Sequence, residues 1–378
     1  MKIGVISADS TTESRVALTP DAVKKLRKLG FEVVVQSGAG LAAYYTDDSY
    51  QTAGADIASS SAEVVEQSQI ITTISDLPAE LTETLKPKQI VVGMLDPYRN
   101  TQLETYATKG ATVFAMELLP RTLSRAQNMD VLSSQANLAG YKAVLLAANE
   151  YSRPFPMFMT SAGTVKPAKV VILGVGVAGL QAIATASRLG AKVEAFDVRP
   201  VAREQVESLG AKFLYMDLDD SAETDSGYAV EMNEEFIRKE MELLHDAAKR
   251  VDAIITTALI FGRPAPILIK DYMVNDMQPG SCIIDMAAEN GGNCELTKPG
   301  EIIHHNGVTI DGTLNLPAQV PYHASQMLSK NISKLLTEVI EDGKIKFDLE
   351  NDIIKGCLVT HEKNIIHEMT KNIIEGNT

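Results

Sequence analysis

A glycine-rich motif near the middle of the sequence restricts the possible folds more than any other feature. The apolar run Lys169–Leu173 leads directly into Gly174-Val175-Gly176-Val177-Ala178-Gly179, and an apolar helical pattern follows. This order of strand, tight turn and helix is typical of a doubly wound α/β sheet. Gly174 permits the sharp bend, Gly176 lets a ligand approach the backbone, and Gly179 lets the helix pack closely on the strand. The helix N-terminus then offers free N–H groups to a pyrophosphate.

An acidic residue stands where this type of sheet binds a ribose. Asp197 ends the next apolar run, Lys192–Asp197, and follows Gly179 by 18 residues. Its carboxylate favours the ribose hydroxyls of NAD(H) and repels the 2′-phosphate of NADP(H), although Arg199 can soften that repulsion. The sequence therefore predicts a dinucleotide site that prefers NAD(H). The alternative is a fold of this type that has lost its ligand.

Short apolar runs alternate with helical patterns along the rest of the chain. Before the glycine motif we expect strands at Lys2–Ser7, Phe31–Gln36, Gln69–Ile74, Ile90–Leu95 and Thr112–Glu117. After it we expect strands at Lys192–Asp197, Lys212–Tyr215, Ala253–Thr256, Ser281–Asp285 and Val308–Asp311. This alternation predicts parallel sheets that are covered by helices on both faces.

Two long helical patterns, at 137–153 and 324–341, stand between these sets of strands. The apolar residues of the first share one face: Leu138, Tyr141, Leu145 and Ala148. The remainder after Gly343 is short for a domain, so we expect it to pack on the first set. The predicted fold class is α/β, with two doubly wound Rossmann-like domains linked by long helices. The expected domains are a discontinuous N-terminal one, residues 1–135 plus 326–378, and a dinucleotide-binding one, residues 136–325.

The composition argues against several kinds of partner. The chain carries 35 Lys and Arg against 49 Asp and Glu, a formal net charge of −14. Nucleic acids and anionic membrane surfaces bind clustered positive charge, so we expect neither as a direct partner. The long uncharged stretch Val170–Ser187 contains the glycine motif, so we expect no membrane insertion. The widely spaced Cys282, Cys294 and Cys357 predict buried, reduced thiols in a cytoplasmic protein.

A second segment, Met116–Tyr141, concentrates polar side chains where a connection leads into a helix. Gln127, Asp130 and Ser133 lie close together in it, after Arg121. A nucleotide ring needs such donors and acceptors to fix its orientation. Without such a ligand, Asp130 is interpreted as a helix N-cap and Gln127 as a solvated loop residue.

Several separated segments, taken in order, carry a resemblance to a known family. They are Glu13–Pro20, Ser124–Gln127 with Met129-Asp130 and Ser133, Gly174–Ala184, Asp197–Arg199, Gly227–Ala229, Thr256–Leu259 and Gly291–Cys294. Together they resemble the soluble NAD(H)-binding alpha component of proton-translocating NAD(P) transhydrogenase, in the alanine dehydrogenase/transhydrogenase family. The resemblance covers nearly the whole chain.

The resemblance implies an oxidoreductase that works with partner components. In that family this component binds NAD(H), and its nicotinamide faces the nicotinamide of NADP(H) on a different component. Hydride passes directly between the rings, and a membrane-spanning component couples the reaction to proton translocation. We therefore expect a homodimer that is cytoplasmic and peripheral to the inner membrane through its partner subunits.

The resemblance also assigns roles to residues of the polar segment. Gln127, Asp130 and Ser133 would hold the nicotinamide carboxamide and ribose. Arg121 would be the arginine of the family's loop, but the spacing from Arg121 to Ser124 is one residue longer than expected. Arg125 is therefore the alternative for that role.

Further residues would line the adenosine and pyrophosphate. Beside Gly174, Gly176 and Gly179, these are Val177, Asp197, Val198, Arg199, Gly227 and Leu259. Tyr228, within the acidic segment Asp217–Glu235, would close over the nucleotide as a lid. The alternative for that segment is a solvated surface insert.

Two other functions are compatible with the fold. An amino-acid dehydrogenase of the alanine dehydrogenase type has an arginine at the position of Arg15, but the expected Lys is missing from Thr72–Asp76 and the expected His from Gly93–Asp96. A non-catalytic NAD(H)-binding sensor is the other alternative. The histidines show no metal-ligand spacing, so we expect no metal site, and His304-His305 is predicted to be a turn.

Overall fold

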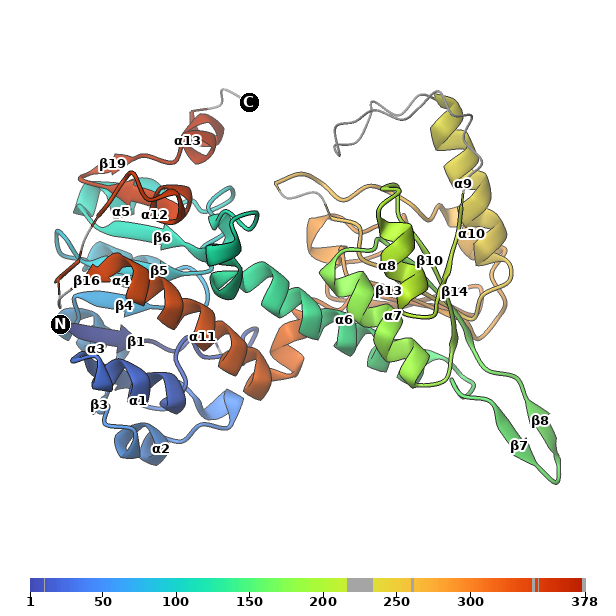
Figure 1. Ribbon diagram of the computed structural model, residues 1–378, viewed down its shortest axis with the longest axis horizontal. Coiled ribbons are helices and arrows are strands. Elements are labelled where there is room, and N and C mark those ends of the chain that lie inside the picture. The colour runs from blue at the N-terminus through green and yellow to red at the C-terminus, as the bar shows by residue number, and fades with distance from the viewer. Residues whose placement is uncertain (10, 216–233, 260–261, 342–343, 346, 376–378) are drawn as a thin grey trace. The chain divides into compact units, whose positions relative to one another are not determined.

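The computed structural model describes residues 1–378 except 10, 216–233, 260–261, 342–343, 346 and 376–378 (Figure 1). The chain divides into two compact units. Unit 1 comprises Met1–Gln135 and Pro317–Thr378, and unit 2 comprises Ala136–Leu316. The chain returns to unit 1 at Pro317, earlier than the predicted position 326. That the units are separately folding domains stays a prediction.

Unit 1 is built on an eight-stranded sheet in the order β19-β18-β6-β5-β4-β1-β2-β3. The strands are β1 (Lys2–Val5), β2 (Glu32–Gln36), β3 (Asp56–Ala58), β4 (Ile70–Thr72), β5 (Ile90–Gly93), β6 (Thr112–Ala115), β18 (Leu358–His361) and β19 (Asn364–Ile365). β1 to β6 are parallel, whereas β18 pairs antiparallel with β6. This pairing confirms that the C-terminal remainder packs on the first set of strands. The order reverses between β1 and β4, which is the topological switch point of the sheet.

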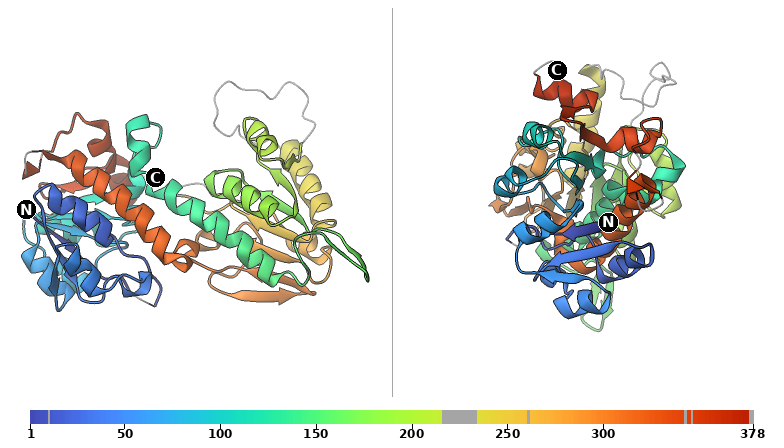
Figure 2. Two further views of the ribbon diagram at one scale, coloured as in Figure 1. Left: turned by 60° about the horizontal axis from the view of Figure 1, so that its bottom comes forward. Right: turned by 90° about the vertical axis from the view of Figure 1, so that its left-hand side faces the viewer.

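Helices cover both faces of this sheet, because alternate residues of each strand point to opposite sides. One core packs the sheet against α1 (Pro20–Lys28), α11 (Pro321–Val339) and α12 (Asp352–Cys357). The other packs it against α3 (Ser61–Gln67), α4 (Ala79–Glu83) and α5 (Leu103–Lys109). Figure 2 shows α11 lying beside α1. The remaining elements are α2 (Asp47–Thr52), α13 (Glu368–Ile374), β16 (Ile340–Glu341), β17 (Lys344–Ile345) and the 3₁₀ turns η1 (Leu41–Ala43), η2 (Met116–Leu118) and η3 (Ser124–Met129).

Unit 2 is built on a seven-stranded sheet in the order β11-β10-β9-β12-β13-β15-β14. The strands are β9 (Lys169–Leu173), β10 (Lys192–Phe196), β11 (Lys212–Phe213), β12 (Ala253–Thr256), β13 (Cys282–Asp285), β14 (Ile302–His305) and β15 (Val308–Asp311). All pairs are parallel except β14 with β15. The order reverses between β9 and β12, so the glycine-rich motif after β9 lies at the switch point of this sheet.

Helices also cover both faces of the second sheet. One core includes α6 (Val131–Glu150), α7 (Val177–Arg188) and α8 (Ala202–Ser208), and the other includes α9 (Glu234–Ala248) and α10 (Asp271–Asn275). The short turns η5 (Ala288–Asn290) and η6 (Leu316–Gln319) complete the described elements. The predicted fold class, α/β with two doubly wound sheets, is confirmed.

The buried face of α6 differs from the predicted one. Ala139, Ala143 and Ala147 are buried, whereas Tyr141 is 38% exposed. Small residues face α7, because a Cβ atom on Gly140 would meet the backbone of Ala178. The apolar pattern was misleading because close helix packing selects alanine and glycine over leucine and tyrosine.

Two strand elements of unit 2 were not expected from the sequence. The hairpin of β7 (Phe158–Thr160) and β8 (Gly163–Val165) projects from the unit, and all its residues are exposed (Figures 1 and 2). His304 and His305 end strand β14, so the prediction that they form a turn is wrong. No helix among the described residues combines the length and the apolar composition needed to cross a bilayer.

Candidate functional site

The glycine-rich turn of unit 2 has the geometry that a pyrophosphate requires. Gly174 has φ +94°, and a Cβ atom there would lie 2.8 Å from the Thr257 hydroxyl oxygen, so only glycine fits. A Cβ atom on Gly176 would meet no atom within 4 Å, so the backbone at this position faces open space. A Cβ atom on Gly179 would collide with the Gly174 carbonyl. The turn thus delivers an accessible backbone to the N-terminus of α7, whose first N–H groups lack intrahelical acceptors.

Asp197 lies directly after β10 and contacts this turn. Its Oδ2 accepts a hydrogen bond from the Val175 amide at 2.7 Å. The guanidinium of Arg199 donates to both carboxylate oxygens, from Nε to Oδ1 at 2.9 Å and from Nη2 to Oδ2 at 2.9 Å. Burial opposes ionisation of Asp197, but the bonds from Arg199 and Val175 hold the pKa of its carboxyl below the ordinary value. Asp197 is therefore a carboxylate that is already paired.

A buried network supports the loop on the other side of the switch point. Asp285 at the end of β13 is 1% exposed and accepts from the amides of Asn293 at 2.8 Å and Cys294 at 3.0 Å. The Asn293 side chain accepts from the Ala258 amide at 3.0 Å and donates to the Ala258 carbonyl at 2.9 Å. Thr257, the preceding residue, donates to the Gly174 carbonyl at 2.9 Å. A continuous chain of hydrogen bonds thus joins Asp285 to the glycine-rich turn.

Sequence reasoning assigned no role to Thr257, Asp285 or Asn293, although Thr257 and Asn293 lie in segments that carry the resemblance. Asp285 offered one usable signal, because it ends a buried strand in the way that Asp197 follows one. The partners of Asn293 lie 27 and 35 residues away. Local pattern therefore could not reveal the network.

The remaining residues predicted to line the nucleotide lie at the surface of unit 2 or outside the described residues. Val177 is 38%, Val198 40% and Leu259 52% exposed, which is unusual for apolar side chains unless a ligand or partner covers them. Gly227 and Tyr228, with the proposed lid, lie outside the described residues.

The polar segment of unit 1 leads into α6 through a capped helix start. Asp130 is 8% exposed and accepts from the amide of Ser133 at 2.9 Å and from its hydroxyl at 2.6 Å. This bonding is that of an N-cap, and it explains why α6 begins at Val131 instead of at Asn137. Asp130 and Ser133 are therefore fixed relative to each other, whatever else they bind.

Gln127 and the two candidate arginines are exposed on the same segment. Arg125 donates to the Asn351 side chain at 2.8 Å and lies 3.6 Å from the Glu338 carboxylate. No such pairing is found for Arg121 among the residues that the structure describes. Of the two, Arg121 is the one whose guanidinium remains available for a ligand.

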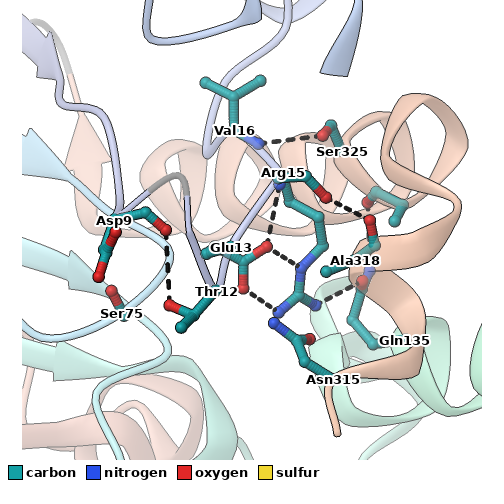
Figure 3. Close-up of polar contacts among 12 residues, drawn as sticks. Asp9, Thr12, Glu13, Arg15, Val16, Ser75, Gln135, Asn315, Ala318 and Ser325 are labelled. Atoms are coloured by element: carbon teal, nitrogen blue, oxygen red, sulfur yellow. Dashed lines mark hydrogen bonds and ion pairs between the residues drawn. The ribbon is translucent and has the colours of Figure 1, made fainter. Parts of the chain in front are cut away.

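The switch point of unit 1 is occupied by a self-contained ion pair (Figure 3). Arg15 donates to Glu13 from Nε at 2.8 Å and from Nη2 at 2.7 Å, and to Gln135 Oε1 from Nη1 at 2.9 Å. The Val16 amide donates to Ser325 at 3.0 Å, which ties the same loop to α11. The Arg15 and Glu13 side chains are 6% and 8% exposed, so the pair is buried. Its geometry satisfies the guanidinium within the protein.

The carboxyl edge of unit 1 also contains a buried acid. Glu117 Oε1 accepts from the Asp96 amide at 2.7 Å, while Oε2 is buried without a hydrogen-bond partner among the described residues. Burial raises the pKa of Glu117 to about 7. The positions that would need a lysine and a histidine in an amino-acid dehydrogenase hold Ser75 and Asp96, so this edge lacks the cation and the base of an oxo-acid pocket.

Metal and thiol chemistry find no support in the described part of the chain. No cluster of His, Cys, Asp and Glu there could hold a metal ion. Cys282, Cys294 and Cys357 are buried free thiols, as predicted. Burial raises the pKa of Cys282 to about 12 and that of Cys294 to about 11, so these thiols are unreactive.

Comparison with known proteins agrees with this geometry. Residues 4–139 match the N-terminal domain of the family described as alanine dehydrogenase/PNT, and residues 143–368 match its C-terminal domain. A relative from Rhodospirillum rubrum, the first of the polypeptides that make up its NAD(P) transhydrogenase subunit alpha, is 47% identical over 97% of this chain and 98% of its own length. A crystal structure of transhydrogenase from Sinorhizobium meliloti superposes with a TM-score of 0.88, at 42% identity over 97% of this chain and all of that one.

A more distant relative marks the other branch of the family. Alanine dehydrogenase of Bacillus subtilis is 26% identical over 97% of this chain and 93% of its own length. The identity to the transhydrogenase subunit is much higher, and the edge of unit 1 lacks the lysine and histidine of the dehydrogenase pattern. The chain therefore belongs to the alanine dehydrogenase/PNT family, and within it to the NAD(P) transhydrogenase alpha subunits.

Proposed function

We propose that this chain binds NAD(H) and exchanges hydride with NADP(H) held by a separate transhydrogenase component. The glycine-rich turn with Asp197, at the switch point of unit 2, carries the proposal. The open backbone at Gly176 and the N-terminus of α7 suit a pyrophosphate, and the Asp197 carboxylate suits ribose hydroxyls. NAD(H) is the nucleotide that this set of groups favours.

The residues of the polar segment would orient the nicotinamide. Gln127 is exposed and can reach a carboxamide, and Arg121 has no competing partner among the described residues. Asp130 and Ser133 hold each other in place, so a ribose or amide would meet a fixed pair of oxygens. Preorganised positioning of this kind lowers the cost of reaching a reactive geometry.

The proposed reaction requires little of the protein's own chemistry. A bound nicotinamide nucleotide supplies or accepts the hydride, so the side chains need only to orient it and exclude water. The absence of a nucleophile, a histidine base and a metal cluster from the described residues is compatible with such a role. The buried, unreactive cysteines are compatible with it as well.

The proposed partners follow from the family and from the name of the relatives as subunits. We infer a homodimer, an NADP(H)-binding component and a membrane-spanning component that couples hydride transfer to proton translocation. Through these subunits the chain would be cytoplasmic and peripheral to the inner membrane. The net charge of −14 supports contact with subunits in preference to anionic lipid.

Mixing experiments test the proposal. NADH should reduce an NADP⁺ analogue only when this chain and an NADP(H)-binding transhydrogenase component are both present, and NADH should bind this chain more tightly than NADPH. Omitting either protein is the control. Robust turnover of pyruvate and ammonia with NADH would instead favour the alanine dehydrogenase activity, and NADH binding without any transfer would favour a sensor.

A further inference from the structure

We propose that Arg199 is a masked 2′-phosphate-binding group and that Asp197 is the residue that masks it. Nucleotide selectivity would then depend on the ion pair between them, and not on the acid alone. This inference rests on the proposed function, because the nucleotide must bind at the glycine-rich turn for the pair to read its ribose.

The pair is a two-point contact with a backbone anchor. Nε and Nη2 of Arg199 each donate to a different Asp197 oxygen at 2.9 Å, and the Arg199 amide donates to Oδ1 at 2.9 Å. The Val175 amide donates to Asp197 at 2.7 Å, while the Val175 carbonyl accepts from Arg199 Nη2 at 3.2 Å. Both side chains therefore grip the residue between Gly174 and Gly176. The guanidinium is held at the place where a ribose would arrive.

The two side chains differ in their freedom to move. Asp197 is 7% exposed at its side chain, whereas Arg199 is 51% exposed. The acid is fixed by the turn, but the guanidinium needs to break only its contacts with Asp197 and Val175 in order to rotate into solvent. An exposed arginine with a fork of donors binds a phosphate as readily as a carboxylate.

Selectivity follows from the competition for that fork. A ribose hydroxyl needs only one lone pair of Asp197, so NAD(H) can bind while the ion pair persists. A 2′-phosphate would have to take Arg199 from a carboxylate that is tethered beside it, and it would then face the uncovered Asp197 charge. Removing the carboxylate should free Arg199 and turn the same pocket toward NADP(H).

A nearby arginine supplies the matched control. Arg203 belongs to α8, where it pairs with Glu207 at 2.9 Å and lies over the Tyr215 ring at 5.7 Å. Its guanidinium thus has partners of its own, and they lie outside both the Asp197–Arg199 pair and the glycine-rich turn. Arg203 therefore reports on general positive charge in this region without taking part in the proposed pair.

The test measures equilibrium binding of NADH, NADPH and 2′,5′-ADP to the whole chain. Asp197→Asn should bind NADPH and 2′,5′-ADP at least about tenfold more tightly than the wild type, and this gain should shrink at high salt. The double variant Asp197→Asn/Arg199→Ala should lose the gain, and Asp197→Asn/Arg203→Ala should keep it. A gain that is absent, or that survives removal of Arg199, would overturn the inference.

A second variant keeps the test decisive if Asp197→Asn does not fold. Arg199→Ala alone leaves Asp197 uncompensated, so NADPH should bind about tenfold more weakly while NADH changes by less than about threefold. Unchanged or tighter NADPH binding would refute the inference. Failure of the proposed function has a different signature, because the wild type would then bind neither NADH nor 5′-AMP.

Discussion

The two units share one topology but use their switch points differently. In unit 2 the connection from β9 to α7 is only Gly174–Gly176, and it leaves the backbone open beside a helix N-terminus. In unit 1 the connection from β1 to α1 runs from Ile6 to Thr19 and fills the same place with the Arg15–Glu13 pair. A switch point becomes a ligand site only when the first connection is short and rich in glycine. When it is long, its own side chains satisfy one another.

The same comparison separates two kinds of ion pair. The pair in unit 1 has both side chains under 10% exposed, whereas Arg199 in unit 2 is half exposed. Burial commits Arg15 to Glu13, because an uncompensated charge inside the protein is costly. Exposure leaves Arg199 able to exchange partners. The first pair serves stability, and the second is suited to ligand selection.

The largest expected effect is on the stability of unit 1. Arg15→Met leaves Glu13 buried without its cation, so the free energy of unfolding should fall by about 3–5 kcal/mol. Denaturant unfolding measures this loss, and Glu13→Gln/Arg15→Met should recover part of it. NADH affinity, measured on the folded variant, should stay within about threefold of the wild type. A larger change would mean that Arg15 belongs to the nucleotide site and would break the comparison.

The second prediction breaks the turn of unit 2. Gly174→Val forces a branched side chain into φ +94° and against Thr257, so NADH binding should weaken by about 100-fold, or ~2.7 kcal/mol. Gly30→Val is the matched control, because Gly30 has φ +88° and no atom within 4 Å of a Cβ atom. It should lower stability and leave nucleotide binding intact. Equal loss of binding in both variants would show that strain alone is responsible.

A third prediction concerns orientation by the polar segment. Gln127→Asn keeps the amide but shortens it by one methylene, so the nicotinamide should lose its orientation more than its affinity. Hydride transfer at saturating NADH should slow about 10- to 100-fold, a cost of ~1.4–2.7 kcal/mol, with little change in the dissociation constant. Ser124→Ala, in the same turn, is the control. A change in affinity with an unchanged saturated rate would contradict the positioning role.

The smallest expected effect is a pH dependence of stability from Glu117. Its pKa is raised to about 7 in the folded protein and is near 4.5 when the chain is unfolded. The unfolded state therefore releases its proton first, and stability should fall as the pH rises from about 4.5 to 7 and then level off. We expect a loss of about 1–2 kcal/mol relative to Glu117→Gln, because the residue keeps some contact with water. Parallel unfolding curves of the two proteins would rule out this titration.

Much of the fold was predictable from local pattern. The bounds of β9, β12 and β15 agree with the predicted strands, because these are buried runs of Val, Ile and Leu between clear breaks. β3, β14 and β18 were missed, since each lies at or near a sheet edge, where the buried apolar run that marks a central strand is shorter or weaker. The start of α6 was misplaced because the cap at Asp130 extends the helix beyond its apolar pattern.

The candidate site was predictable only in part. The glycines and Asp197 carry their chemistry in their spacing, so the sequence was sufficient to place them in one turn. The pairing of Asp197 with Arg199 depends on a side-chain conformation that spacing does not encode. The amide of Asn293 reaches Ala258 across 35 residues, which only the folded sheet brings together. The roles of Gln127, Ser133 and Leu259 stay predictions.

The discontinuity of unit 1 has a consequence for how the polypeptide matures during synthesis. Leu328, Ile332 and Leu335 of α11 and the residues of β18 belong to the core of unit 1, yet they emerge from the ribosome after all of unit 2. The first 135 residues must therefore wait with an uncovered apolar face. Unit 2 is continuous and meets no such delay, so it should become protease-resistant on the nascent chain first. Chains halted shortly after residue 316 should need chaperone protection that the finished chain does not.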